Sequence, residues 1–230
     1  MKLGLFSLIG LILFSRVTLA EGVPSNDQEF MRYMQMKADQ AQMEDELKNP
    51  KNPDMGKDRA VLGNRTAPIK LFVYSDFQCP YCKRGYETVE ELRKQYGNKI
   101  VVMFKHLPLP FHPMALPAAK RFEAIALESS KKAYQFHNEL FSNQQGLSGG
   151  EEFLDGLVKK VGADLAKVKK NIDSPVVKNH IEADKAEAQK YGIQGTPGFV
   201  IAGVTVKGAY PIDTFVKIIN ERLGSSIKGK

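Results

Sequence analysis

The chain of 230 residues contains two cysteines, Cys79 and Cys82, and two residues separate them. They follow an apolar run at residues 69–74 that predicts a buried strand, and Pro80 suits the first turn of a helix, where its missing N–H would have no partner. Cys79 would then lie at a helix N-terminus, where unpaired backbone N–H groups and the helix dipole stabilise a thiolate. Two thiols so close can form a small ring, and a Cys79 thiolate can attack another disulfide, so this placement predicts thiol–disulfide exchange.

Other roles for the cysteine pair fit the sequence less well. A zinc site generally needs four ligands, and the chain has no second paired motif. Its four histidines are scattered, at His106, His112, His137 and His180. A structural bridge across two residues would constrain little of the unfolded chain. Copper or another soft metal on the two thiolates is a minor alternative. We therefore expect neither a metal nor another cofactor.

The N-terminus has the pattern of an export signal. Lys2 precedes an apolar core at residues 3–14, and the small-residue stretch Thr18-Leu19-Ala20 resembles a cleavage site. The apolar run is shorter than the roughly 20 residues that a membrane-spanning helix needs. We therefore expect residues 1–20 to be a cleaved signal peptide and the mature protein to be periplasmic, in an oxidising compartment that suits disulfide chemistry.

The formal charge of +7 at neutral pH is not gathered in one block. Lys and Arg residues are spread along the predicted helices, which is typical of solvated helix faces. A nucleic-acid site would need a clustered basic stripe. We therefore expect no nucleic-acid partner.

Residues 26–47 predict a helix that lies before the main domain. The segment has no Gly or Pro, and Ser25 or Asn26 offers an N-cap ahead of Glu29. Its apolar residues make it amphipathic: Phe30, Met31, Tyr33, Met34, Met36, Met43 and Leu47. A breaker-rich linker at residues 49–53 follows it. The alternatives are a helix that folds back onto its own domain and an arm, over residues 26–48, that joins two or more copies of the chain. We favour the arm.

The rest of the chain predicts an α/β domain with a helical insertion. A strand at 69–74, a helix from Pro80 to residue 96 and a strand at 100–104 indicate a parallel pair with a right-handed crossover. Apolar residues at helical spacing then predict five helices, at 116–129, 132–141, 151–161, 164–171 and 176–191. Two short strands at 199–201 and 204–206 and a helix at 211–223 complete the chain.

A strand that ends at Cys79-Pro80-Tyr81-Cys82, with a later Gly195-Thr196-Pro197 before a hairpin, closely resembles the thioredoxin fold. The stretches 75–84 and 104–109 resemble the exported disulfide-bond oxidoreductases of the DsbA type, and the similarity runs over about residues 59–223. The resemblance implies a thioredoxin fold interrupted by a helical subdomain, and the helical arm predicted above precedes this fold. The expected parts are a signal peptide at 1–20, an arm and linker at 21–57, the first half of the fold at 58–112, the insertion at 113–191 and the second half at 192–230.

The resemblance also implies roles for individual residues. Cys79 would be the exposed nucleophile, Cys82 the buried resolving thiol, and Pro197 a cis-proline that faces the pair. A cis bond before Pro197 would present the N–H and C=O of Thr196 beside the sulfurs, so that an extended substrate could pair there as an added strand. An ordinary trans-proline is the alternative. Pro80 and Tyr81 would tune the reduction potential, and the positive charges of Lys83 and Arg84 would lower the pKa of Cys79. The candidate site is therefore Cys79, Pro80, Tyr81, Cys82, Thr196 and Pro197.

One departure from the family concerns proton transfer. Many members carry a buried glutamate in the strand before the cysteines, where it helps to move a proton from the resolving thiol. Val73 stands at that position here. Water or Lys105 would have to take over this role.

These features predict an enzyme that forms or rearranges disulfides in reduced or misoxidised exported proteins and that exchanges electrons with a membrane redox partner. Oxidase and isomerase or reductase directions both remain open. Thr196 before the proline resembles the pattern common in isomerases, and an oligomerising arm would resemble isomerases of the DsbC and DsbG type. The alternative class is a non-catalytic protein of the cell envelope, either a chaperone or a copper carrier that uses Cys79, Cys82 and the methionines between residues 31 and 43.

Overall fold

The structure is a computed structural model that describes residues 26–228, with side chains described to residue 224. The predicted signal peptide at 1–20 lies outside the described residues. The chain divides into two compact units, Met1–Gln42 and Met43–Lys230. Within the described residues, no helix combines the length and the apolar character needed to cross a membrane.

Helix α1 (Asp27–Lys48) forms where the sequence predicts it, and Oδ1 of Asn26 accepts a hydrogen bond from N–H of Glu29 at 2.8 Å. Its apolar residues do not form one stripe. At about 100° per residue, Phe30 and Met34 point to one side, and Met43 and Leu47 point to the other. Met43 and Leu47 pack against the core of the larger unit. The last turn of α1 is therefore part of the larger unit.

A glutamate fixes that last turn to the edge of the sheet. Glu46 is buried, and its Oε2 accepts a hydrogen bond of 2.5 Å from the backbone N–H of Thr205. Nζ of Lys51 lies 3.7 Å from the other carboxylate oxygen. The edge strand thus has one of its backbone donors satisfied by a side chain.

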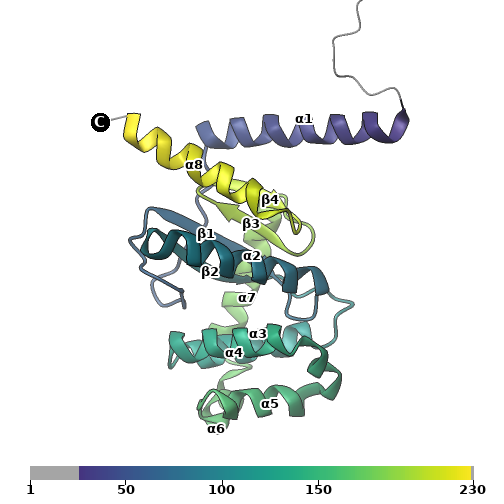
Figure 1. The fold of residues 1–230 in the computed structure, drawn as a ribbon. Helices are drawn as coiled ribbons and strands as arrows, with labels where there is room; N and C mark the ends of the chain where they lie inside the picture. The colour runs from purple at the N-terminus through teal and green to yellow at the C-terminus, as the bar shows by residue number, and fades with distance from the viewer. Residues whose placement is uncertain (1–25, 229–230) are drawn as a thin grey trace, which may run out of the picture. The chain divides into compact units, whose positions relative to one another are not determined.

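The sheet has four strands in the order β2-β1-β3-β4 (Figure 1). Strands β1 (Ile69–Ser75) and β2 (Ile100–His106) are parallel, with Ile69 opposite Ile100, which confirms the predicted pair. Strand β3 (Gly198–Ile201) is antiparallel to β1 and forms a hairpin with β4 (Val204–Lys207). The Cys79 and Cys82 segment therefore begins at the end of a central strand.

Helices cover both faces of the sheet (Figure 1). Helix α2 (Pro80–Tyr96) and helix α8 (Ile212–Lys228) pack on one face, where Leu92 and Phe215 share a core with Leu71 and Val73. Helix α8 is longer than the predicted 211–223. Helix α7 (Pro175–Lys190) covers the other face, where Ala188 joins the alternate residues of β1 and β2. This alternation decides which side chains can reach Cys82.

The helices of the insertion share a core with the cysteine segment and strand β2, through Phe77, Cys82 and Phe104. Its helices are α3 (Ala115–Ala126), α4 (Ser130–Ser142), α5 (Gly150–Lys160), α6 (Leu165–Asn171) and α7, and the short 3₁₀ helix η2 (Gln144–Gly149) lies between α4 and α5. A second 3₁₀ helix, η1 (Gly97–Lys99), lies outside the insertion, between α2 and β2. The five predicted helices are present. Side chains of Ser129, Asp164 and Ser174 cap α4, α6 and α7, which explains their start points.

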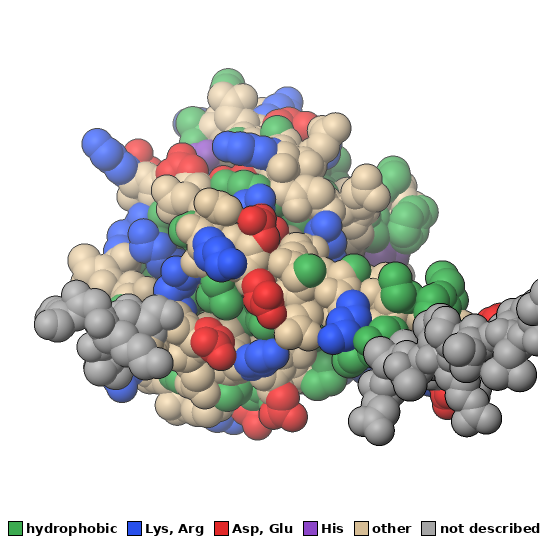
Figure 2. Space-filling model, turned by 90° about the horizontal axis from the view of Figure 1, so that it is seen from above, with side chains coloured by type: hydrophobic (Ala, Val, Ile, Leu, Met, Phe, Trp, Pro, Cys, Tyr) green, Lys and Arg blue, Asp and Glu red, His purple; other side chains and the backbone are tan. Residues whose placement is uncertain are grey.

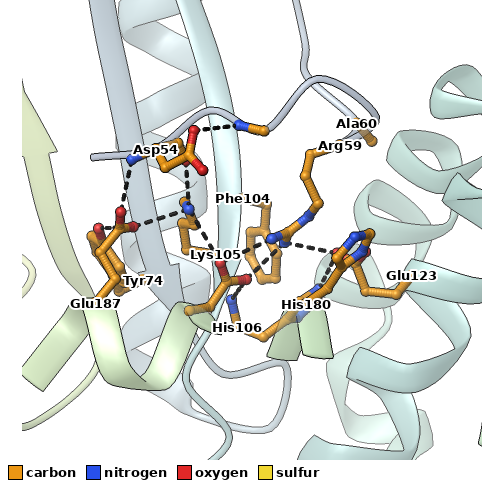
Figure 3. A network of polar contacts seen from close by, with 12 residues as sticks. Asp54, Arg59, Ala60, Tyr74, Phe104, Lys105, His106, Glu123, His180 and Glu187 are labelled. Carbon is orange, nitrogen blue, oxygen red and sulfur yellow. Dashed lines mark hydrogen bonds and ion pairs between the residues drawn. The ribbon is translucent and has the colours of Figure 1, made fainter. Parts of the chain in front are cut away.

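A buried ion-pair network joins the linker, the sheet and the insertion (Figure 3). Nη2 of Arg59 lies 2.7 Å from Oδ2 of Asp184 and 3.0 Å from Oε1 of Glu123. Nζ of Lys105 lies 3.2 Å from Asp184 and 2.9 Å from Glu187. Each buried charge therefore has an opposite charge beside it, as burial in a low dielectric requires.

On the face shown in Figure 2, Lys and Arg side chains are interspersed with Asp and Glu side chains. This mixture is typical of a solvated surface.

Candidate active site around Cys79 and Cys82

Both cysteines are free thiols at the start of α2. Cys79 is the N-cap residue with an extended backbone, and N–H of Cys82 donates to the Cys79 carbonyl at 3.0 Å to close the first turn. Cys82 is 1% exposed and Cys79 4% exposed. The prediction of an exposed Cys79 is therefore wrong, because its sulfur packs against Cys82 and the Thr196 backbone.

Hydrogen bonds favour a thiolate at Cys79. The Cys82 thiol donates to the Cys79 sulfur and lowers the pKa of Cys79 to about 5, against an opposing effect of burial. The Thr196 side chain and the backbone N–H groups of Cys82 and Tyr81 act in the same direction and contribute to this lowered pKa. Arg84, whose charge is predicted to lower this pKa, has its guanidinium 5.7 Å from the ring centre of Tyr81.

Cys82 has the opposite character. Burial raises the pKa of the Cys82 thiol far above its ordinary value, and the hydrogen bond to Cys79 raises it further. The Ser75 side chain and the backbone N–H of Asp76, 3.4 Å from Sγ of Cys82, act in the other direction and are weaker. The pair therefore combines an acidic thiol and a buried thiol that holds its proton.

The Thr196–Pro197 peptide bond is cis, as predicted, and the Thr196 carbonyl accepts a hydrogen bond from Sγ of Cys79 at 3.5 Å. Gly85 lets this loop approach α2 closely. A Cβ at Gly85 would lie 3.2 Å from Cγ of Pro197 and 3.0 Å from Cζ of Phe199. The second half of the fold thus meets the cysteines directly.

The two residues between the cysteines face outward. Pro80 is exposed, and Tyr81 is 57% exposed. The structure therefore brings all six predicted site residues into one region, with Pro80 and Tyr81 at its surface and Cys79 in contact with Thr196.

Sequence reasoning missed a polar frame around the cysteine loop. Oδ1 of Asp76 accepts from N–H of Gln78 at 2.7 Å, and Oδ2 accepts from N–H of Leu109 and contacts Nδ1 of His112, both at 2.8 Å. Asp76 belongs to the stretch that carries the family resemblance, which is the one signal that could have marked it. The carboxylate thus fixes the chain on both sides of the site.

Gln144 of η2 was missed as well. Its Nε2 donates to the carbonyls of Phe77 and Cys79 at 2.9 and 2.8 Å. The contact joins residues that are 65 positions apart, so no local pattern could have shown it. Through it the helical insertion holds the reactive loop in place.

The predicted proton role of Lys105 is wrong. Lys105 lies on the face of the sheet that α7 covers, and its Nζ contacts the Asp54 carbonyl at 2.7 Å as well as Asp184 and Glu187 (Figure 3). Cys82 packs on the opposite side, with Phe104. Alternation along β2 directs Lys105 away from the thiol.

One cluster in the described part of the chain has three side chains of the metal-binding kind close together: His106, Glu123 and Asp184. All three are buried. Arg59 and Lys105 already pair with the carboxylates, and Nδ1 of His180 lies 2.7 Å from Oε2 of Glu123. The cluster therefore fits a structural network and not a cation site.

A thioredoxin family model matches residues 56–221. This chain belongs to the thioredoxin family. Several solved structures share its fold. Wolbachia pipientis alpha-DsbA1 is 19% identical with a TM-score of 0.66, over 80% of this chain and 98% of that one. BdbD from Bacillus subtilis is 23% identical with a TM-score of 0.65, over 76% and 97%. The catalytic domain of Proteus mirabilis ScsC is 24% identical with a TM-score of 0.64, over 82% and 98%.

Curated relatives are much longer proteins. The Na(+)/H(+) antiporter NhaA 1 of Mycolicibacterium vanbaalenii is 27% identical over 176 residues, which are 75% of this chain and 27% of that protein. The antiporter NhaA of Herminiimonas arsenicoxydans is 29% identical over 173 residues, or 75% and 26%. The chain thus spans about a quarter of the length of these relatives. The family model covers most of this chain, and the solved structures share its fold.

Proposed function

We propose that the chain is a thiol:disulfide oxidoreductase that forms or rearranges disulfides in exported proteins. One observation carries the proposal: Cys79 lies at the N-cap of α2 beside the buried Cys82 and the Thr196 backbone. Hydrogen bonds there lower the pKa of Cys79 to about 5, whereas burial raises that of Cys82. A low-pKa sulfur is a good leaving group and is reactive as a thiolate at neutral pH. The cis-Pro197 loop places a backbone carbonyl beside it.

The reaction has two exchange steps. A substrate thiolate attacks Sγ of Cys79 in the oxidised pair, which forms a mixed disulfide and breaks the bond to Cys82. Cys82 leaves with two electrons and takes up a proton. A second substrate thiolate then attacks the substrate sulfur of the mixed disulfide, so the substrate gains a disulfide and Cys79 leaves as a thiolate. The same two steps in the reverse direction reduce a substrate disulfide. Reduction of one substrate disulfide followed by formation of another rearranges the substrate.

The surrounding residues have distinct parts in this proposal. Thr196 offers its backbone to an extended substrate beside Cys79, in the manner of an added strand. The surface pair Pro80 and Tyr81 contacts the substrate and tunes the potential through the stability of the thiolate. Pro197 fixes the loop that carries Thr196.

The proposed setting is the periplasm. The export pattern at residues 1–20 supports it, and a thioredoxin-like protein of similar fold from Salmonella enterica serovar Typhimurium is described as periplasmic, at 21% identity and a TM-score of 0.61. Partners would be reduced or misoxidised exported proteins and a membrane protein that restores the redox state of the pair. We further propose that the first part of α1 associates with other copies, since Phe30, Met31, Met34 and Met36 are exposed.

Two assays test the function. The mature chain should reduce insulin with a dithiol as electron source and should refold a substrate with scrambled disulfides. Cys79→Ser should abolish both activities, whereas Cys82→Ser should still form a mixed disulfide that is not resolved. Retained turnover in Cys79→Ser would refute the assignment. A chaperone or copper carrier would instead suppress aggregation or take up metal and fail both redox assays.

The direction of the reaction is tested in the native compartment. Alkylation of free thiols in intact cells traps the pair in its working state. An oxidised pair supports an oxidase, and a reduced pair supports an isomerase or reductase.

A further inference from the structure

The inference rests on the proposed function and concerns the proton of Cys82. When the bond between the cysteines breaks, Cys82 is released as a thiolate in an apolar setting that strongly favours the neutral thiol. Cys79 needs no such proton, because hydrogen bonds stabilise its thiolate. Each turnover therefore moves one proton to or from Sγ of Cys82, which is 1% exposed. A route through the protein is required.

A small cavity lies next to Cys82. Its volume is about 20 Å³, which is enough for a water molecule. Cys82, Tyr86 and Glu90 all line it, because residues four apart on α2 share one face of the helix. Ser75, whose side chain bonds to Cys82, lines it as well. The wall of the cavity therefore includes both the buried thiol and a glutamate of the same helix.

Most other titratable groups around the cavity are unsuited to carry this proton. Burial raises the pKa of Tyr86 and of Tyr134, and the Tyr134 hydroxyl already accepts from N–H of Phe104 at 3.2 Å. Burial lowers the pKa of His137 to about 4, and its Nδ1 lies 2.9 Å from Oδ1 of Asn138. His137 is therefore neutral at physiological pH, enclosed by aromatic rings.

Glu90 differs from these groups in its access to water. Its side chain is 27% exposed, so it can exchange protons with solvent, and it also lines the cavity. Nη1 of Arg93 lies 2.7 and 3.0 Å from its two oxygens and holds the carboxylate in place. Among the described residues that line the cavity, Glu90 is the only one with a carboxyl group.

We propose that Glu90 exchanges a proton with Cys82 through a water molecule in this cavity. During reduction of the pair, the Glu90 carboxylate takes up a proton from solvent and gives it to the water, and the water gives a proton to the departing Cys82 sulfur. During resolution of a mixed disulfide at Cys79, the proton moves the other way. Cys82 then attacks Sγ of Cys79 and expels the bound thiol.

Rapid mixing of the reduced chain with oxidised glutathione tests the relay. A first phase, dependent on glutathione concentration, forms the mixed disulfide at Cys79, and a second, independent phase is its resolution by Cys82. In Glu90→Gln we expect the second phase to slow by about 100-fold near neutral pH, the lower range of general acid–base catalysis. The rates of the two proteins should converge at alkaline pH, where hydroxide removes the proton directly. A loss of structure would not give this convergence.

Two further variants complete the experiment. Glu90→Asp keeps a carboxylate and should retain most of the rate and the pH profile. Glu87→Gln changes an exposed residue of the same helix and should behave as the unchanged chain. An unaltered second phase and pH profile in Glu90→Gln, or a pH dependence lost in His137→Phe alone, would overturn the relay. If the unchanged chain never reaches the second phase, the proposed function itself fails.

Discussion

At the scale of single residues, the two cysteines carry the same side chain and differ in acidity because their surroundings differ. Cys79 receives hydrogen bonds at the N-terminus of α2, and Cys82 is enclosed by apolar residues. The disulfide of the oxidised pair carries no charge and no proton that titrates, whereas the thiols of the reduced pair do titrate. The stability of the reduced state relative to the oxidised state therefore depends on pH.

The first prediction concerns this pH dependence. The folded-state pKa of Cys79 is about 5, below the ordinary value of 9.0, so its stabilising effect is complete above pH 9.0 and is lost as pH falls toward 5. The melting temperature of the reduced chain, minus that of reduced Cys79→Ser, should rise steadily across this window. The raised pKa of Cys82 acts in the opposite sense only above its ordinary value of 9.0. Thermal unfolding at a series of pH values measures the difference, and parallel curves would contradict it.

The second prediction concerns the contact between α2 and the cis-proline loop. In Gly85→Ala the new methyl group would press on Pro197 and Phe199, which should destabilise the chain by about 1–3 kcal/mol and slow mixed-disulfide formation. Gly156 in α5 has open space around it, so Gly156→Ala should stabilise the chain by about 0.5–1 kcal/mol without changing the exchange rate. Denaturant unfolding and the glutathione reaction measure both effects. Equal stabilities of the two variants would contradict the close contact between Gly85 of α2 and the loop that carries Pro197.

At the scale of elements, the sequence predicts regular features better than their long-range partners. The apolar run of β1, the proline that opens α2 and the caps of the insertion helices are local signals, and the structure confirms these elements. The β-branched and aromatic content predicts strand β2 only to residue 104, whereas the strand continues through Lys105 and His106. Both are buried in the strand and paired with side chains from α3 and α7. Ion pairs between residues far apart in the sequence cannot be predicted from a local pattern.

The same limit applies to the candidate site. The six predicted residues come from two short motifs, and both motifs meet in the fold. Gln144 and Glu90 were missed because their importance depends on where the insertion and α2 pack. Val73 stands where the family pattern has a glutamate. This difference indicates that another group must move the proton of Cys82, but it does not show which group.

The third prediction tests the network that joins the linker to α3 and α7. Arg59→Met removes a cation between the buried Glu123 and Asp184, so it should destabilise the chain by about 3–5 kcal/mol. Lys160→Met breaks an exposed pair with Glu139 and should cost at most about 1 kcal/mol. Chemical denaturation of both variants measures these values. Similar losses in the two variants would show that the Arg59 pairs contribute no more than a surface pair.

At the scale of the whole molecule, the reactive centre is assembled from three parts of the chain. The end of β1 and the start of α2 supply the cysteines, the loop before β3 supplies Thr196, and η2 of the insertion supplies Gln144. The insertion and the second half of the fold therefore both constrain Cys79. Changes in either part can alter its reactivity without touching the sulfur.

The fourth prediction concerns association through the first part of α1. Phe30 and Met34 lie one turn apart on α1 and are 41% and 49% exposed, so a second copy could bury both. Light scattering at micromolar concentration should give a mass above that of one mature chain. Met34→Glu, which places a charge in the contact, should lower that mass to one chain, whereas Gln28→Glu at an exposed position should leave it unchanged. A single-chain mass for the unchanged protein would rule out the arm, and the redox assays would then have to be explained by a monomer.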